Sequence, residues 1–177
     1  MPSLRLFLFR GFLPVLPPTT MEIIMEKVSS QSIPHHFSKE RSIKDAINTY
    51  MLASYCGALK KEKHIILAGI CLRIAWLYRI NQTKEQEERF LKFALKEYEA
   101  SYSTGDFSGT QVSETKILYL AGDISRRIGN EKAAIKYFSL VFERQKNARE
   151  ASIIQMARDR FQELKQKHET SHPMLLH

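Results

Sequence analysis

The sequence predicts an all-α protein built from helical hairpins, and three observations support this fold class. Glycine and proline are scarce, with 7 and 6 residues among 177, as is typical of helical proteins. Apolar residues recur at helical spacing from Ser42 onward, and no sustained apolar–polar alternation indicates strands. Two helical segments in residues 118–142 flank a Gly129-Asn130 turn. A chain of this length can bury one core, so we expect one helical domain over residues 39–168.

Residues 1–38 precede the periodic part, and we expect them to form a poorly structured leader and linker. Residues 1–16 are apolar with two arginines, but they fall short of the roughly 20 apolar residues that span a bilayer. No small-residue cleavage pattern of a signal peptide follows. We therefore expect no stable membrane insertion and a cytoplasmic protein, with an interfacial anchor as an alternative for the leader. A short helix is expected over Met21–Val28.

Two helices are expected in the first part of the domain. The first begins after Ser42, whose side chain can form a capping box with Asp45, and ends near Lys60. The second covers about Ile65–Tyr78 and is apolar almost all round. Such a helix packs on more than one side, so we expect it to be central and assign Trp76 to the core.

The third helix, from Lys84 to about Tyr102, has a charged outer face typical of a solvent-exposed helix. Thr83 and Gln86 offer a capping box at its start. Residues Ser103–Val112 contain two glycines and several hydroxyl side chains, which indicates a loop. Ser113 then suits the cap of a fourth helix.

The fourth and fifth helices form the hairpin with the most specific pattern in the sequence. Gly129 suits the left-handed residue that ends a helix, and Asn130 can cap the fifth helix, Glu131 to about Gln145. Small residues let the two helices approach, and bulky residues fill the groove to the next hairpin. The small residues are Ala121, Gly122 and Ala134, and the bulky ones are Leu118, Phe138 and Val141. The pattern resembles a tetratricopeptide repeat.

A sixth helix, about Arg149–His168, has one apolar face and mixed charge opposite, and we expect it to cap the last hairpin. Residues 169–177 are expected to be a disordered tail. Aligning Ile80-Asn81-Gln82 with Ile128-Gly129-Asn130 indicates a first, divergent hairpin about 48 residues earlier, against roughly 34 for a standard repeat. The predicted architecture is therefore tetratricopeptide-like antiparallel hairpins of about six helices, with a capping C-terminal helix.

Residues from about Phe37 to Leu164 resemble a bacterial family catalogued only as a domain of unknown function, family 2225. Five segments support the resemblance: FSKERSIKDAINTYMLASYC, AGICLRIAWLYR, FLKFALKEYEASY, LYLAGDISRRIGNEKAAIKYF and IIQMARDRF. The resemblance implies tetratricopeptide-type helices preceded by a zinc knuckle with Cys-x-x-Cys pairs. Such pairs do not occur here, so no zinc ligand is carried over. One hypothesis is that residues 1 to about 17 are an out-of-frame translation of a lost knuckle, which the nucleotide sequence would test.

Enzyme chemistry and metal binding are not indicated by any motif. The sequence contains no Gly-rich phosphate loop, no His-Glu-x-x-His and no nucleophile elbow. Paired carboxylates such as Glu87-Glu88 fall on a solvated helix face, where nothing shields a proton transfer. Cys56 and Cys71 lie on apolar helix faces and are expected to be buried, reduced thiols. We expect no enzyme activity, no metal and no cofactor.

The sequence favours a protein–protein interaction scaffold. In tetratricopeptide hairpins the first helix of each pair lines the concave surface, so the resemblance implies a groove for a protein or acidic peptide. The alternative for the residues of the fourth helix is ordinary surface, with Asp123 paired to Arg127. The net charge of +8 is dispersed, which disfavours nucleic acid but keeps a basic nucleic-acid-associated protein as the alternative function. Self-association stays open. The groove residues are Tyr78, Arg79, Lys116, Tyr119, Asp123, Arg126 and Arg127.

Overall fold

The computed structural model describes residues 18–29, 42–144 and 150–171, and these residues form helices and the turns between them, without a strand. The all-α prediction is therefore confirmed. In chain order the elements are α1 (Pro18–Ile24), the π-helical turn η1 (Met25–Ser29), α2 (Ile43–Leu59), α3 (His64–Ile80), α4 (Lys84–Thr104), α5 (Glu114–Arg127), α6 (Glu131–Glu143) and α7 (Ala151–Ser171).

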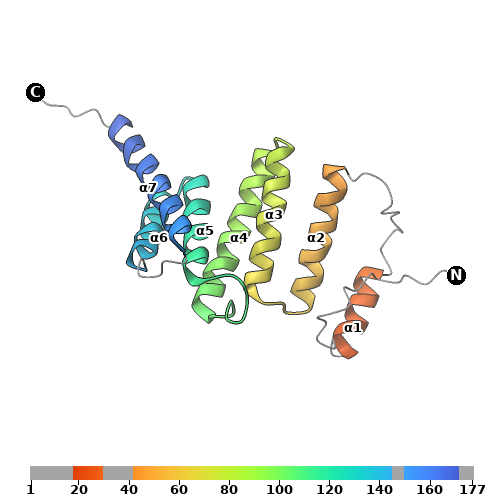
Figure 1. Cartoon of the computed structure of the whole chain (residues 1–177). Helices are drawn as coiled ribbons and strands as arrows, with labels where there is room; N and C mark the ends of the chain where they lie inside the picture. Colours follow the sequence, from red (N-terminus) through yellow and green to blue (C-terminus); the bar gives the residue numbers. More distant parts are fainter. Residues whose placement is uncertain (1–17, 30–41, 145–149, 172–177) are drawn as a thin grey trace, which may run out of the picture.

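The helices stack in chain order, with α2, α3, α4 and α5 side by side and α6 and α7 at one end (Figure 1). The most closely packed helices are α3 with α4 and α5 with α6, and they form two hairpins. Helices α4 and α5 also pack on each other and so connect the two hairpins. Helix α2 packs on α3, and α7 packs on both α5 and α6. Each helix thus contacts mainly its neighbours, as in a repeat stack, and α7 closes one end as expected of the capping helix.

Three of the four predicted helix caps form. Ser42 and Asp45 make the complete capping box. Ser113 accepts from the backbone N–H of residue 116 at 3.1 Å, and Asn130 accepts from that of residue 133 at 3.2 Å. The capping box predicted at Thr83 is wrong, because the Thr83 hydroxyl bonds the side chain and carbonyl of Asn81 instead. Local sequence chemistry therefore sets most helix starts.

The two hairpins repeat at an interval of 47 residues, one fewer than predicted. Gln82 and Gly129 both adopt left-handed backbone conformations, with φ of 58° and 79°. The residues after them close the same turn: Thr83 donates to the carbonyl of Tyr78, and Asn130 donates to that of Ser125. These paired turns fix the equivalence between α3–α4 and α5–α6, and the sequence alignment of the turns was off by one position.

The corrected interval explains the packing of both hairpins. Gly122 on α5 lies against Phe138 on α6, and the equivalent residues of the first hairpin are Ala75 and Leu91, which are also buried. A larger side chain on the second helix is thus matched by a smaller one on the first. This is the close approach that small residues permit.

Trp76 does not belong to the core. Its side chain is 47% exposed, because it lies one position beyond the buried Ile74 and Ala75 on the outer side of α3. Cys71 is buried as expected, whereas Cys56 is only half-buried. The assignment of Trp76 to the core is therefore a wrong prediction.

The connection between the hairpins is anchored to the start of α3. Asp106 accepts hydrogen bonds from the backbone N–H of His64 and from the hydroxyl of the fully buried Ser101, both at 2.5 Å. The carboxylate therefore satisfies one of the free N–H groups at the positive end of α3. In addition, the Lys63 ammonium donates to the carbonyl of Ser108 at 3.3 Å.

Several boundaries differ modestly from the predictions. Helix α4 continues through Ser103 and Thr104, so the loop is shorter than predicted. Helix α7 extends to Ser171, so the predicted disordered tail begins within a helix. The short helix expected near Met21–Val28 is present, as α1 and η1. The rest of the leader and linker, residues 1–17 and 30–41, and residues 172–177 lie outside the described part of the chain.

Candidate binding surface

The charged residues predicted on α5 form a network within the helix. Asp123 Oδ1 accepts from Arg126 at 2.8 Å, and its Oδ2 accepts from Arg127 at 2.8 Å. The spacings of three and four residues place these side chains on one face of α5. The ion pair between Asp123 and Arg127 was predicted by the alternative interpretation, in which these residues are ordinary surface and not a binding groove.

Helix α7 extends this network and covers part of it. Arg160 lies 4.0 Å from Asp123, and Glu163 lies 3.7 Å from Arg126. The Asp123 side chain is only 16% exposed. Its burial raises the pKa, but the hydrogen bond from Arg126 and the charge of Arg127 outweigh this effect and hold the pKa of Asp123 below its usual range. The part of the predicted groove around Asp123 and Arg126 is therefore partly covered by the chain's own last helix.

The other two residues predicted on α5 differ from each other in exposure. Lys116, one turn from the helix start, is exposed. Tyr119 is half-buried, and its ring centroid lies 6.4 Å from that of Phe138. Lys116 is thus open to a partner, whereas Tyr119 packs against the buried residues around Phe138.

On α3, Tyr78 and Arg79 are engaged by neighbouring helices. The Tyr78 ring stacks on Phe90 with centroids 5.6 Å apart, and its hydroxyl lies 4.0 Å from the sulfur of Met51. Arg79 donates to Glu87 at the start of α4. With the 47-residue interval, Tyr78 is equivalent to the buried Ser125. Tyr78 therefore occupies a packing position of the repeat.

The residue equivalent to Asp123 is Trp76, which sequence reasoning placed in the core. Trp76 lies on an outer stripe of α3 that we call the α3 face. Its members follow helical spacing and are all exposed, Ile66 by 44%, Trp76 by 47% and Ile80 by 63%, together with Arg73. The register of α3 is set by the left-handed turn at Gln82, and a glutamine at positive φ gives no signal in the sequence.

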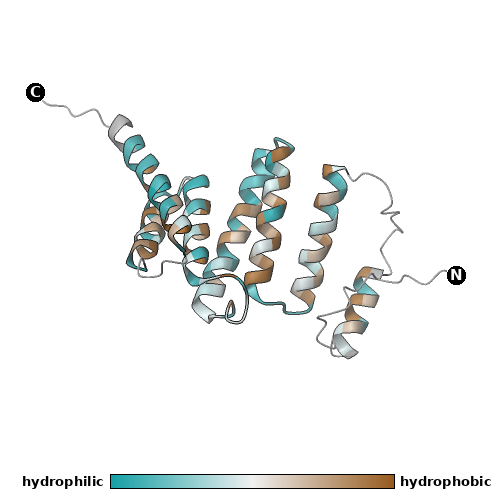
Figure 2. Ribbon diagram, in the orientation of Figure 1, coloured by the Kyte–Doolittle hydropathy of each residue, from teal (hydrophilic) through white to brown (hydrophobic). Residues whose placement is uncertain are grey.

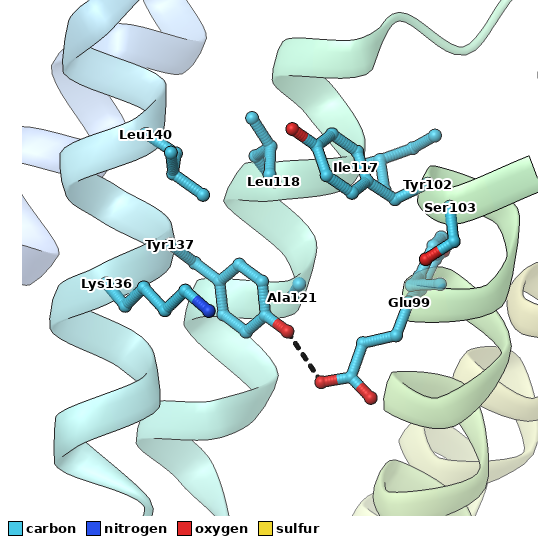
Figure 3. A pocket seen from close by; sticks show the side chains of 10 residues that line it. Glu99, Tyr102, Ser103, Ile117, Leu118, Ala121, Lys136, Tyr137 and Leu140 are labelled. Atoms are coloured by element: carbon cyan, nitrogen blue, oxygen red, sulfur yellow. Dashed lines mark hydrogen bonds between the residues drawn. The ribbon is translucent and has the colours of Figure 1, made fainter. Parts of the chain in front are cut away.

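A separate cleft of about 290 Å³ opens between α4, α5 and α6 (Figure 3). Ile117, Leu118 and Ala121 line it from α5, on the opposite side of this helix from the charged network. The Tyr137 hydroxyl donates to Glu99 across the cleft at 2.5 Å. Burial and this carboxylate raise the pKa of Tyr137. The Tyr137 hydroxyl and the Glu99 carboxylate thus satisfy each other.

Within the described ranges, no group of three or more His, Cys, Asp or Glu side chains is arranged to hold a metal ion. The nearest approach to an acid–base pair is His64 Nδ1, which lies 2.7 Å from Glu97 Oε2. None of the described helices is long and apolar enough to cross a bilayer.

Comparison with protein families matches residues 8–164 to the family described as an uncharacterized protein conserved in bacteria (DUF2225). The chain belongs to this family. The match ends at Leu164, where the sequence resemblance ended, but it begins 29 residues before Phe37 and includes residues assigned to the leader. Comparisons with curated proteins and with solved structures returned no match.

Membership of the DUF2225 family thus covers every helix described here except the last part of α7. The family description assigns no activity and no ligand. A function for this chain therefore has to be argued from its own surface.

Proposed function

We propose that this protein is a cytoplasmic scaffold that binds a protein or peptide partner along the first helices of its hairpins, α3 and α5. The observation that carries the proposal is the exposed Trp76 on the α3 face, flanked by Arg73 and Ile80. Tryptophan and arginine are the side chains most enriched among residues that dominate binding energy. A half-exposed tryptophan between an arginine and an isoleucine suits a partner with an apolar anchor and an acidic neighbour.

The charge on α5 supports the same class of partner. Lys116 is exposed, and Arg127 keeps 29% of its side chain exposed while it pairs with Asp123. Cations on both helices favour an acidic segment, because a carboxylate forms charge-assisted hydrogen bonds with them. Arg79 contributes less to this surface, since Glu87 already pairs with it.

The protein contains one tryptophan, so its own fluorescence can test the proposal. Partners are first captured from the native host with the wild type, Trp76→Ala and Arg73→Glu as baits. Met156→Ala serves as a matched control, because Met156 is similarly exposed, by 42%, on α7 and away from the α3 face. Arg126 and Arg127 are poor probes, since charge reversal there would disrupt the α5–α7 network.

The expected result is a partner that binds the wild type and Met156→Ala but loses at least about tenfold in affinity with Trp76→Ala. Adding the purified partner to the wild type should shift Trp76 emission to shorter wavelength, because the indole leaves water. A partner that binds all three variants equally would contradict the proposal. Recovery of nucleic acid that dissociates at moderate salt would favour the alternative function.

A further inference from the structure

The cleft between α4, α5 and α6 combines an apolar floor with aromatic walls. These three helices are amphipathic, and hydrophilic and apolar residues alternate along each of them (Figure 2). The floor consists of α5 residues that are 1–2% exposed, namely Ile117, Leu118 and Ala121. The walls are tyrosine side chains from α4 and α6, namely Tyr98, Tyr102 and Tyr137. The volume of about 290 Å³ lies at the small end of the range for ligand sites.

Two of the tyrosine rings are held in place by hydrogen bonds of their hydroxyl groups. The Tyr137 hydroxyl, which enters from α6, donates to Glu99 of α4 across the cleft (Figure 3). The Tyr102 hydroxyl accepts from Arg144 at 3.0 Å, and Arg144 is itself paired with Glu114 at 2.7 Å. Rings that are fixed in advance lose little conformational entropy when a ligand binds.

The negative charge of Glu99 is not balanced by any cation in the described part of the chain. Its Oε1 accepts from the neutral Tyr137 hydroxyl, but the carboxylate makes no ion pair with a described residue. Lys136 lines the same cleft, yet it makes neither an ion pair nor a ring contact within the described ranges. The carboxylate can therefore pair with a cation from outside the chain.

The first hairpin shows what occupies the equivalent position there. With the 47-residue interval, the α6 residues that line the cleft, Lys136, Tyr137 and Leu140, correspond to Arg89, Phe90 and Phe93 of α4. The Arg89 guanidinium lies over the rings of Phe90 and Phe93, 5.9 and 5.7 Å from their centroids. The first hairpin thus supplies its own cation to these rings. The second hairpin has a ring and a carboxylate, but no described cation of the chain lies over that ring.

We propose that this cleft binds a small methylated ammonium compound, with the charged group between the tyrosine rings and the Glu99 carboxylate. The faces of aromatic rings attract cations, and cages of aromatic side chains are typical of quaternary ammonium sites. Methyl groups suit the floor, because its side chains offer no hydrogen-bond acceptor to the N–H groups of an ordinary ammonium ion. This site is separate from the scaffold function, since it lies on the opposite side of α5 from the charged network.

The test is isothermal titration calorimetry of the full chain with choline chloride up to about 10 mM, a range that detects millimolar affinity. Sodium chloride keeps the ionic strength constant. The comparison ligand is 3,3-dimethylbutan-1-ol, which has the shape of choline without its charge. We expect choline to bind at least about fivefold more tightly than this alcohol.

Two matched substitutions on α4 test the role of the carboxylate. Glu99→Gln removes the charge but keeps an acceptor for Tyr137, and it should weaken choline binding about threefold or more. Glu85→Gln removes an exposed carboxylate from the same helix, away from the cleft, and should leave the affinity unchanged. Equal effects of the two substitutions would overturn the proposal.

Two substitutions on α6 test the ring and the neighbouring cation. Tyr137→Leu should abolish measurable choline binding, and circular dichroism establishes that this variant keeps its helices. Lys136→Met removes a positive charge from the cleft, so it should strengthen choline binding about two- to threefold. Choline that binds no more tightly than the neutral alcohol would overturn the proposal, as would a wild type that binds no choline at the highest concentration.

Discussion

The ring of Phe138 on α6 lies so close to Gly122 on α5 that a Cβ atom on residue 122 would stand 2.7 Å from the ring edge. The Phe138 side chain is completely buried, so it cannot move aside. We expect Gly122→Ala to lower the free energy of unfolding by about 1–3 kcal/mol, as overpacking does. Urea denaturation followed by circular dichroism measures this loss.

Gly69→Ala provides the matched control. Gly69 is also inside a helix, but an added Cβ would meet only the flexible end of Arg73, at 3.2 Å. There, alanine should stabilise the helix by up to about 1 kcal/mol. The double variant Gly122→Ala/Phe138→Leu reproduces the pair Ala75 and Leu91 of the first hairpin. Its free energy of unfolding should therefore fall by less than the sum of the decreases in the two single variants. Strict additivity would contradict the proposed close contact.

The left-handed residues of the two turns give a second prediction. Gln82 adopts φ of 58° at the position where the second hairpin has Gly129. Gln82→Gly should therefore raise the free energy of unfolding by about 0.5–1 kcal/mol, and Gly129→Gln should lower it by a similar amount. Thermal unfolding of the two variants measures both changes. Equal effects of the same sign would show that the two turns are not equivalent.

A third prediction concerns Ser125, whose hydroxyl is fully buried and has no hydrogen-bond partner among the described residues. Ser125→Ala removes this unsatisfied polar group and adds helix propensity. We expect the free energy of unfolding to rise by about 0.5–2 kcal/mol. Chemical denaturation tests the change. Ser101→Ala is the contrast, because the buried Ser101 hydroxyl donates a hydrogen bond to Asp106 and its removal should lower the free energy of unfolding. Destabilisation by both substitutions would contradict the prediction.

The charged network between α5 and α7 predicts a dependence on pH. Because the pKa of Asp123 in the folded protein is lowered, its contribution is present above the pKa of the unfolded chain, near 4. The contribution is lost as the pH falls through the lower folded pKa. We expect Asp123→Asn to cost about 1 kcal/mol at pH 7 and progressively less towards about pH 2. Unfolding curves of both proteins across this range provide the test, and a constant difference would contradict it.

The fold could be predicted because its signals are local. Ser42, Ser113 and Asn130 are capping residues next to amphipathic runs, and the structure uses all three. The binding surface could not be predicted with the same accuracy, because its register depends on a turn residue without a sequence signal. Glutamine at positive φ is rare, so the turn at Gln82 was placed one residue off. This error made Tyr78 a groove residue, whereas Trp76 was assigned to the core because its helix is apolar almost all round.

The contacts of α7 with α5 also could not be predicted from the sequence. The pattern on α5 indicated an open groove, but Arg160 and Glu163 approach that helix from a distant part of the chain. No periodicity within α5 reveals which charges of a later helix will lie opposite. The function assigned to this face, the absence of enzyme activity and the nature of the partner stay predictions.

The anchoring of Asp106 to the start of α3 has a consequence for how the protein unfolds. In a stack with contacts only between neighbours, each hairpin can open on its own, and cooperativity is limited. Here one carboxylate, in the segment that leads into the second hairpin, holds the N-terminus of the first, 42 residues earlier. The start of α3 therefore cannot open fully without releasing the connection that follows α4. Native-state hydrogen exchange should find the start of α3 and this connection opening together, and Asp106→Ala should let them open separately.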